Sequence, residues 1–198
     1  MGNNRDQAFL AGLRQGDADC YRKMVNEYIG PMLGVARRYL DEDDARDAVQ
    51  EAFIKLHSAI DTFRGESSLL TWLQRILINI CLSRLRKAKQ INEVSIDDFL
   101  PDFFENGHRM NPKGDWPGAL SESMNREKIC ELLHENIKLL PGTHRTVLLL
   151  RDIDGFSCRE TAEKLGISVS ATKVRLHRAR LALRELLEPL ILGESFEL

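Results

Sequence analysis

Apolar residues recur every three or four positions along most of the chain, and no stretch alternates convincingly between apolar and polar residues. This pattern predicts an all-α fold. Pro31 suits the first turn of a helix, and the acidic run from Asp41 to Asp47 suits a helix start, where carboxylates oppose the positive end of the dipole. In the N-terminal half we expect helices over about 17–29, 31–40, 41–60 and, after a cap at Ser67 or Ser68, up to about 87.

Helical periodicity fails between residues 89 and 120. This stretch holds three prolines, three glycines and six acidic against three basic residues, a composition typical of a linker. Fully extended, it reaches roughly 100 Å at about 3.3 Å per residue. We therefore expect two small helical domains, at 1–88 and 121–198, joined by a flexible acidic linker at 89–120.

Helical periodicity resumes over 121–140 and, after Pro141-Gly142, over about 143–152. Ser157 and Glu160 then form a capping box for a short helix that ends at a glycine, Gly166. Ser168 can cap a last helix that runs to about Leu187, before Pro189. Two helices joined by a tight glycine-containing turn form the helix-turn-helix pattern.

The last helix sorts its residues by face. An apolar stripe at helical spacing comprises Thr172, Leu176, Ala179, Leu183 and Leu187. Five basic residues lie between Lys173 and Arg184, and the first acidic residue is Glu185. A solvated helix normally carries both positive and negative side chains along its surface. The unbroken basic run therefore favours DNA binding, in which the lysine and arginines contact phosphates. The candidate DNA-contacting residues are Ser170, Lys173, Val174, Arg175, His177 and Arg178.

Composition is that of an ordinary soluble protein of 198 residues, 43% hydrophobic and 29% charged, with a formal net charge of −2. The net charge alone does not indicate binding to nucleic acid, but the local clustering of like charges does. Four cysteines stand far apart without zinc-ligand spacing, which favours unpaired thiols in a reducing compartment. The N-terminus lacks a signal-peptide core, and polar residues interrupt the most apolar stretch, 69–85, so we expect a cytoplasmic protein without membrane insertion.

Sequence motifs of enzymes are not apparent. The five histidines form no metal-binding motif, and neither a phosphate-binding glycine loop nor a nucleophile elbow occurs. We expect no catalytic residue, metal, cofactor or small-molecule substrate. The runner-up interpretation of the whole chain is a stand-alone helix-turn-helix regulator, with 1–120 as a sensor or dimerisation domain. A third possibility, a helix-turn-helix that has lost DNA binding, is disfavoured by the basic run.

Two motifs in order resemble a known family. They are DARDAVQEAFIKLHSAIDTFRGESSLLTWLQRILINICLSRLR and, after the linker, LLPGTHRTVLLLRDIDGFSCRETAEKLGISVSATKVRLHRARLALREL. The chain resembles the bacterial sigma factors of the extracytoplasmic-function group over about 8–88 and 122–188. The resemblance implies a protein that guides core RNA polymerase to promoters, the N-terminal domain opening and reading the −10 element and the C-terminal domain reading the −35 duplex. It also implies an anti-sigma partner that masks both domains.

One side of the helix that follows the acidic run carries Asp47, Gln50, Glu51 and Ile54 at helical spacing. In the family, the matching face docks a coiled coil of the largest polymerase subunit. Acidic residues beside a glutamine and an apolar side chain can pair with arginine and lysine across such an interface. The resemblance therefore implies that these four residues bind core polymerase.

The loop before the next helix, DTFRGESSLLTWL, holds a base flipped out of the −10 non-template strand in the family. Unstacking costs a few kcal/mol, which stacking and hydrogen bonds to the base recover. The implied −10 residues are Arg64, Ser67, Ser68, Arg75, Asn79 and Arg84, with Arg86 and Lys87 along the backbone. Phe63 and Trp72 are better read as core or loop-anchoring aromatics.

The C-terminal helix departs from the family pattern. Aligned on RLHRAR, most relatives place a valine where Thr172 stands and a small polar residue where Val174 stands. We expect Thr172 to face the core, bonding back to a carbonyl of the preceding turn, and Val174 to face DNA, where it can touch a thymine methyl. Lys173 and Arg178 remain candidates for base or phosphate contacts.

In the family, the linker threads through polymerase channels that otherwise hold nucleic acid. Its acids here, Asp97, Asp98, Asp102 and Glu105, can mimic a phosphate backbone there. A disordered tether explains the sequence equally well.

Overall fold

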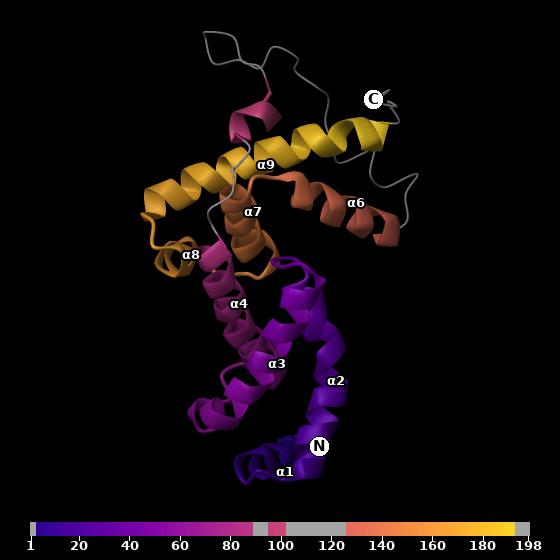
Figure 1. Ribbon diagram of the computed structural model, residues 1–198, viewed down its shortest axis with the longest axis vertical. Coiled ribbons are helices and arrows are strands. Elements are labelled where there is room, and N and C mark those ends of the chain that lie inside the picture. Colours follow the sequence, from indigo (N-terminus) through magenta and orange to yellow (C-terminus); the bar gives the residue numbers. More distant parts are fainter. Residues whose placement is uncertain (1–2, 89–94, 102–125, 193–198) are drawn as a thin grey trace. The chain divides into compact units, whose positions relative to one another are not determined.

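The computed structural model describes residues 3–88, 95–101 and 126–192. Every regular element in these ranges is helical, which confirms the expected all-α fold (Figure 1). The chain divides into two compact units, Met1–Gln90 and Ile91–Leu198.

The N-terminal unit is a small helical bundle. Helix α3 packs against both α2 and α4, and its buried side carries small residues that allow close approach of its neighbours: Ala45, Ala48, Val49 and Ala52. The larger fully buried side chains are Leu13, Met24, Met32, Leu56, Leu73 and Leu77. The elements are α1 (Asn3–Arg14), α2 (Ala18–Ala36), α3 (Glu42–Ala59), a 3₁₀ turn η1 (Ile60–Thr62) and α4 (Leu69–Ala88).

The prediction of two helices separated before Pro31 is wrong, because α2 runs continuously through this proline. Proline leaves the carbonyl four residues earlier, that of Glu27, without its helical donor. Both residues are exposed, so water can satisfy that carbonyl. Buried side chains on either side, Met24 and Met32, hold the two halves in one core and keep the helix continuous.

Helix α1 is an element that the sequence pattern did not predict. It is anchored by Leu13, which is fully buried. Arg14 then donates from Nη2 to the carbonyl oxygen of Phe63 at 3.1 Å. This bond ties the end of α1 to the loop that precedes α4.

The C-terminal unit is organised around one long helix, α9, which packs against α6, α7, α8 and η2 (Figure 1). The fully buried residues of this unit include Val147, Leu150, Thr161, Thr172 and Ala179. The expected helix over 143–152 is confirmed, with a π-helical end. The elements are η2 (Ile96–Phe99), α6 (Arg126–Leu139), α7 (Gly142–Leu148), η3 (Leu149–Ile153), α8 (Cys158–Leu165) and α9 (Val169–Leu192).

The helix-turn-helix is confirmed in its local detail. Ser157 Oγ accepts from the backbone N–H of Glu160, and the Glu160 carboxylate accepts from the backbone N–H of Ser157, so both bonds of the capping box are present. Helix α8 ends at Gly166, which is left-handed with φ 66°. Ser168 Oγ accepts from the backbone N–H of Ala171 at 3.0 Å and so caps α9.

The expected end of the last helix near Leu187 is wrong, because α9 continues through Pro189 to Leu192. Leu187 is 3% exposed, and Pro189 is itself buried. Burial of the Pro189 ring and of Leu187 therefore outweighs the loss of one helical hydrogen bond, which a local rule cannot anticipate.

All four cysteines are free thiols, as expected. Among the described residues, no helix is long and apolar enough to cross a bilayer. The same ranges hold no group of three or more His, Cys, Asp or Glu side chains arranged to bind a metal ion.

We expect Gly166→Ala to lower the free energy of unfolding by about 1–2 kcal/mol, because an L-residue in the left-handed region is strained. No atom lies within 4 Å of the added Cβ, so the cost comes from the backbone alone. Urea denaturation followed by circular dichroism measures it. Gly34→Ala, inside α2 and also with open space around the added Cβ, is the control and should stabilise by about 0.5–1 kcal/mol. Equal effects of the two changes would contradict the left-handed turn.

Candidate functional site

The four candidate polymerase-binding residues lie together on the solvent side of α3. Asp47, Gln50 and Ile54 are exposed and Glu51 is half-buried, while the opposite side of the helix forms the core. Ile54 is 73% exposed, a large apolar side chain that makes little contact within the chain. The face therefore combines one apolar centre with a carboxylate and amide surround.

Arg84 of α4 lies against this acidic face rather than apart from it. Its Nη1 is 3.0 Å from Asp44 Oδ1 and 4.0 Å from Asp47 Oδ2, and its Nη2 is 3.3 Å from Glu51 Oε2. The resemblance to the family implies that Arg84 is a −10 DNA residue. The sequence gives no local signal for its pairing with Glu51 and Asp44, because these residues lie 33 and 40 positions away.

The carboxylate of Glu51 is held from two sides. Lys55 donates to Oε1 at 2.9 Å, and this hydrogen bond lowers the pKa of Glu51 the most; desolvation opposes the shift and the bond from Arg84 adds to it. Glu51, Lys55 and Arg84 also line a groove of ≈ 410 Å³ that continues to Asn79 and Lys87 of α4. One candidate docking residue, Glu51, thus shares this groove with two candidate −10 residues, Asn79 and Arg84.

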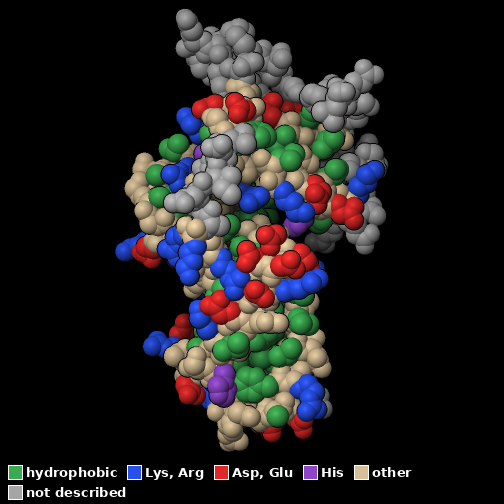
Figure 2. Space-filling view, viewed as in Figure 1, with side chains coloured by type: hydrophobic (Ala, Val, Ile, Leu, Met, Phe, Trp, Pro, Cys, Tyr) green, Lys and Arg blue, Asp and Glu red, His purple; other side chains and the backbone are tan. Residues whose placement is uncertain are grey.

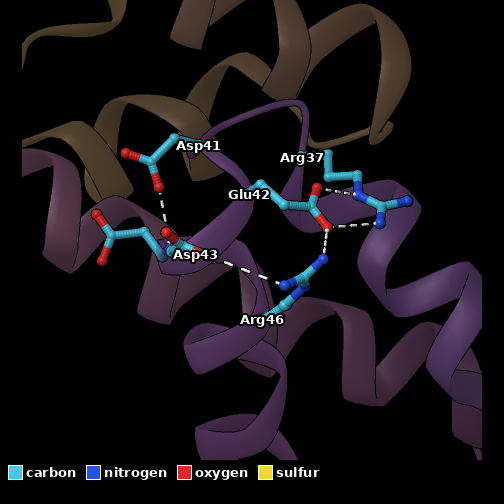
Figure 3. A network of polar contacts seen from close by, with 6 residues as sticks. Arg37, Asp41, Glu42, Asp43 and Arg46 are labelled. Atoms are coloured by element: carbon cyan, nitrogen blue, oxygen red, sulfur yellow. Dashed lines mark hydrogen bonds and ion pairs between the residues drawn. The ribbon is translucent and has the colours of Figure 1, made fainter.

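The start of α3 is tied to the end of α2 by charge. Arg37 donates to both oxygens of Glu42, at 2.7 and 2.8 Å, and Arg46 lies 2.9 Å from the same carboxylate (Figure 3). Asp41 Oδ1 accepts from the backbone N–H of Asp44 at 2.9 Å and so caps the helix. Figure 2 shows acidic and basic side chains gathered on this part of the N-terminal unit. The acidic run thus opens a helix, as predicted.

The Arg37–Glu42 bridge should make stability depend on pH. The hydrogen bond from Arg37 is the main reason that the pKa of Glu42 lies below its ordinary value of 4.5. A lowered folded-state pKa contributes stability that is present above pH 4.5 and is lost as the pH falls through the folded value. We expect the difference in urea midpoint between the wild-type protein and Glu42→Gln to be largest near neutral pH and to shrink below pH 4.5. A difference that is constant with pH would contradict this assignment.

The loop between η1 and α4 is anchored at both ends and exposed between them. Phe63 is 6% exposed and packs against the Trp72 ring at 5.4 Å between centroids, which confirms its anchoring role. Ser68 Oγ accepts from the backbone N–H of Thr71 at 3.0 Å, so this hydroxyl serves as a helix cap. Arg64 and Ser67 are exposed between the two anchors. Their side chains, that of Glu66 and the loop backbone are therefore accessible polar groups.

Arg75 and Asn79 follow on α4. They stand four residues apart, share one face of the helix and are both exposed. Arg86 and Lys87 are exposed at the end of the same helix. The structure thus presents this candidate −10 set on α4 and the loop before it, with Arg84 turned to α3.

The candidate −35 residues of α9 are presented as the sequence predicted. Those with exposed side chains are Ser170, Lys173, Val174, His177 and Arg178, while Arg175 is half-buried. Val174 is 53% exposed and Thr172 is fully buried. Thr172 Oγ1 donates to the Ser168 carbonyl at 3.1 Å, which confirms the expected bond to the preceding turn.

Two described contacts restrict the basic residues of α9. Arg180 donates to both oxygens of Asp152, at 2.8 and 2.6 Å, and so fastens α9 to η3. Arg178 Nη1 lies 3.7 Å from Asp97 Oδ1, which belongs to the expected linker. The linker acids Asp102 and Glu105 lie outside the described residues.

These surfaces define a two-unit helical protein of the DNA-binding class, with its helix-turn-helix in the C-terminal unit. Residues 24–91 match the family model Sigma-70 region 2, and residues 130–183 match Sigma-70, region 4. The chain is 32% identical over 191 residues to the RNA polymerase sigma-H factor of Pseudomonas aeruginosa, covering 94% of this chain and 96% of the relative. It is 31% identical over 193 residues to the ECF RNA polymerase sigma-E factor of Escherichia coli K12, with the same coverage.

The chain belongs to the sigma-70 family, within its extracytoplasmic-function group, and is a sigma factor that directs RNA polymerase to promoters. The match to region 2 lies in the N-terminal unit, which disfavours a stand-alone regulator with a sensor domain there. Its fold is also similar to that of the Bartonella quintana sigma factor RpoE, solved in complex with the anti-sigma factor NepR. The TM-score is 0.50 at 24% identity, over 85% of this chain and 96% of that chain.

Proposed function

We propose that the face of α3 formed by Asp47, Gln50, Glu51 and Ile54 docks core RNA polymerase. The observation that carries this proposal is the 73% exposure of Ile54 among acidic and amide side chains. An exposed apolar side chain with a charged surround has the composition of an interface hot spot with its polar rim. The carboxylates favour a basic partner surface and steer its approach.

The loop around Arg64 and Ser67, together with Arg75 and Asn79 of α4, contacts the −10 non-template strand. The exposed loop between the buried side chains of Phe63 and Leu69 offers side-chain and backbone groups to the edge of an unstacked base. Arg75 can neutralise phosphates, and Asn79 can form hydrogen bonds with a base. Ser68 supports this surface as the cap of α4.

Helix α9 reads the −35 element in the major groove. Lys173 and Arg178 contact phosphates or base edges, Val174 touches a thymine methyl, and Ser170 and His177 extend the same surface. Arg175 lies at its flank. The linker is long enough for the two units to occupy separate elements, since DNA rises about 34 Å per turn.

The protein is proposed to act in the cytoplasm as an initiation factor without catalytic activity of its own. An anti-sigma factor is the expected negative regulator, because the similar RpoE was solved with one. Such a partner competes with polymerase or DNA for the surfaces of α3, α4 or α9.

To test the proposed function, purified protein is mixed with core RNA polymerase. We expect the two to co-elute, and we expect the mixture to transcribe genomic fragments from specific start sites. The free protein should bind promoter duplex weakly and with steep salt dependence, because phosphate contacts release counterions. Failure to co-elute, combined with a strong footprint of the protein alone on an operator, would contradict the proposal.

A further inference from the structure

The guanidinium of Arg84 bridges acidic residues along α3. Asp44, Asp47 and Glu51 lie three and four positions apart and so share one side of the helix. The Arg84 side chain is 27% exposed, against 41% for that of Glu51, so the arginine is more enclosed than the carboxylates that it binds. Together with Lys55, it occupies both oxygens of Glu51.

We propose that Arg84 is a positioning residue for polymerase docking, an inference that rests on the proposed role of α3. It holds the Glu51 carboxylate in one orientation before the partner arrives. Ordering a long side chain in advance lowers the entropy lost on binding. A planar guanidinium can bridge two carboxylates, whereas the point charge of a lysine cannot do so equally well.

The same geometry argues against Arg84 as a phosphate contact. Its charge is compensated by Asp44 and Glu51 at 3.0 and 3.3 Å, so a phosphate would have to displace these carboxylates. Arg75 of the same helix is exposed. It provides the matched comparison.

The test measures the affinity of the full-length protein for core polymerase, and promoter opening by holoenzyme at saturating protein. Arg84→Ala should weaken core binding about fivefold, mainly through faster dissociation, which is the scale of ordering one long side chain. The loss should shrink in a Glu51→Ala background, and Arg84→Lys should recover part of it. Arg75→Ala should leave core affinity unchanged and weaken promoter opening.

The outcomes separate this inference from the proposed function. If Glu51→Ala and Ile54→Asp weaken core binding and Arg84→Ala does not, Arg84 has no positioning role. If neither of those two changes affects core binding, the docking face itself is wrong. Unchanged core affinity with impaired opening in Arg84→Ala would return Arg84 to the DNA-contacting set. An equal loss in wild-type and Glu51→Ala backgrounds would also overturn the inference.

An independent observation concerns the acidic segment at 95–100, which packs on α9 within the C-terminal unit. Ile96 is 6% exposed. Ser95 Oγ accepts from the backbone N–H of Asp97 at 3.2 Å and so caps the short turn η2. This turn brings Asp97 within 3.7 Å of Arg178. η2 lies on the side of α9 away from α7 (Figure 1), and Arg178 is the candidate DNA-reading residue that it contacts.

We infer that residues 95–100 form an intramolecular cover for Arg178, within the DNA-reading face of α9, an inference that rests on the proposed role of this helix. Ile96 is the anchor, because an exposed ion pair by itself stabilises little, and Asp97 occupies the position of a phosphate beside Arg178. Duplex DNA must displace this segment before Arg178 can contact it. The cover therefore lowers the affinity of the free protein for DNA until the segment is drawn away from α9.

The test of this cover measures the affinity of the full-length free protein for a DNA duplex. The duplex carries the −35 element located upstream of the start sites found in the transcription experiment. Ile96→Ala should bind about fivefold tighter, the gain expected when an Arg178 side chain that is mostly paired with Asp97 becomes fully available. Asp97→Asn should give a smaller gain that fades with salt. Asp98→Asn, the same change at the adjacent exposed position, is the control and should bind as the wild type does.

Wild-type affinity in both Ile96→Ala and Asp97→Asn would overturn the cover, and so would equal gains in the Asp97 and Asp98 variants. Arg178→Ala distinguishes a failure of the cover from a failure of the reading helix. If it weakens duplex binding, α9 is the reading helix and only the cover is in question. If it has no effect, the proposed −35 role of this part of α9 is wrong.

Discussion

Replacing Ile54 by aspartate should lower the affinity for core RNA polymerase about 10- to 100-fold, because the change removes the apolar centre of the docking face and buries a charge where an apolar contact is lost. Ile54 is 73% exposed, so the change removes almost no packing within the free protein. Its melting temperature should therefore stay close to that of the wild type. Competition for limiting core enzyme, read as transcription from one promoter, measures the loss.

Ile29→Asp is the matched control. Ile29 is also an exposed isoleucine, at 43%, but it lies on α2, outside the docking face. This variant should bind core polymerase as the wild type does. Equal losses in the two variants would indicate a general effect of added negative charge, and no loss in Ile54→Asp would remove this face from the docking site.

Charge reversal at Lys173 should weaken promoter binding by holoenzyme about 10- to 100-fold, because it replaces an attraction to DNA by a repulsion within the major groove. Lys173 is exposed in the first half of α9, where a recognition helix contacts DNA. The slope of log affinity against log salt should also fall by about 0.9 for each phosphate that the variant no longer neutralises. Titration of a labelled promoter fragment at several salt concentrations measures both quantities.

Lys138→Glu is the control for charge. Lys138 is exposed on α6 of the same unit, pairs with Glu135 at 2.8 Å and is not one of the candidate −35 residues. It should change promoter affinity and salt slope little. Comparable effects of the two reversals would mean that net charge, not placement on α9, determines binding.

Local signals in the sequence predicted the helix-turn-helix correctly. The Ser157–Glu160 capping box, the left-handed Gly166 and the buried Thr172 each depend on residues within a few positions of one another. Interactions of such short range can be derived without knowledge of the fold. The exposure of Ile54 and Val174 followed equally well from helical periodicity, since a helix with one buried side must present the other to solvent.

Local rules failed where packing outweighs them. Pro31 and Pro189 are helix-breaking signals by sequence, yet both lie within helices. In α2 the unpaired carbonyl faces water and buried side chains continue on both sides of the proline. In α9 the proline is itself buried. The strength of the surrounding core decides such cases, and no short window of sequence contains it.

The sequence by itself determined the helical fold, the caps and the faces of α3 and α9, because helical periodicity and capping act over three or four residues. Only the tertiary structure decided the partners of the charged residues. Arg84 meets Glu51 across 33 positions, and Asp97 meets Arg178 only because Ile96 is buried against the C-terminal unit. Ion pairs between distant segments depend on how helices pack, and packing sums many weak contacts along the whole chain.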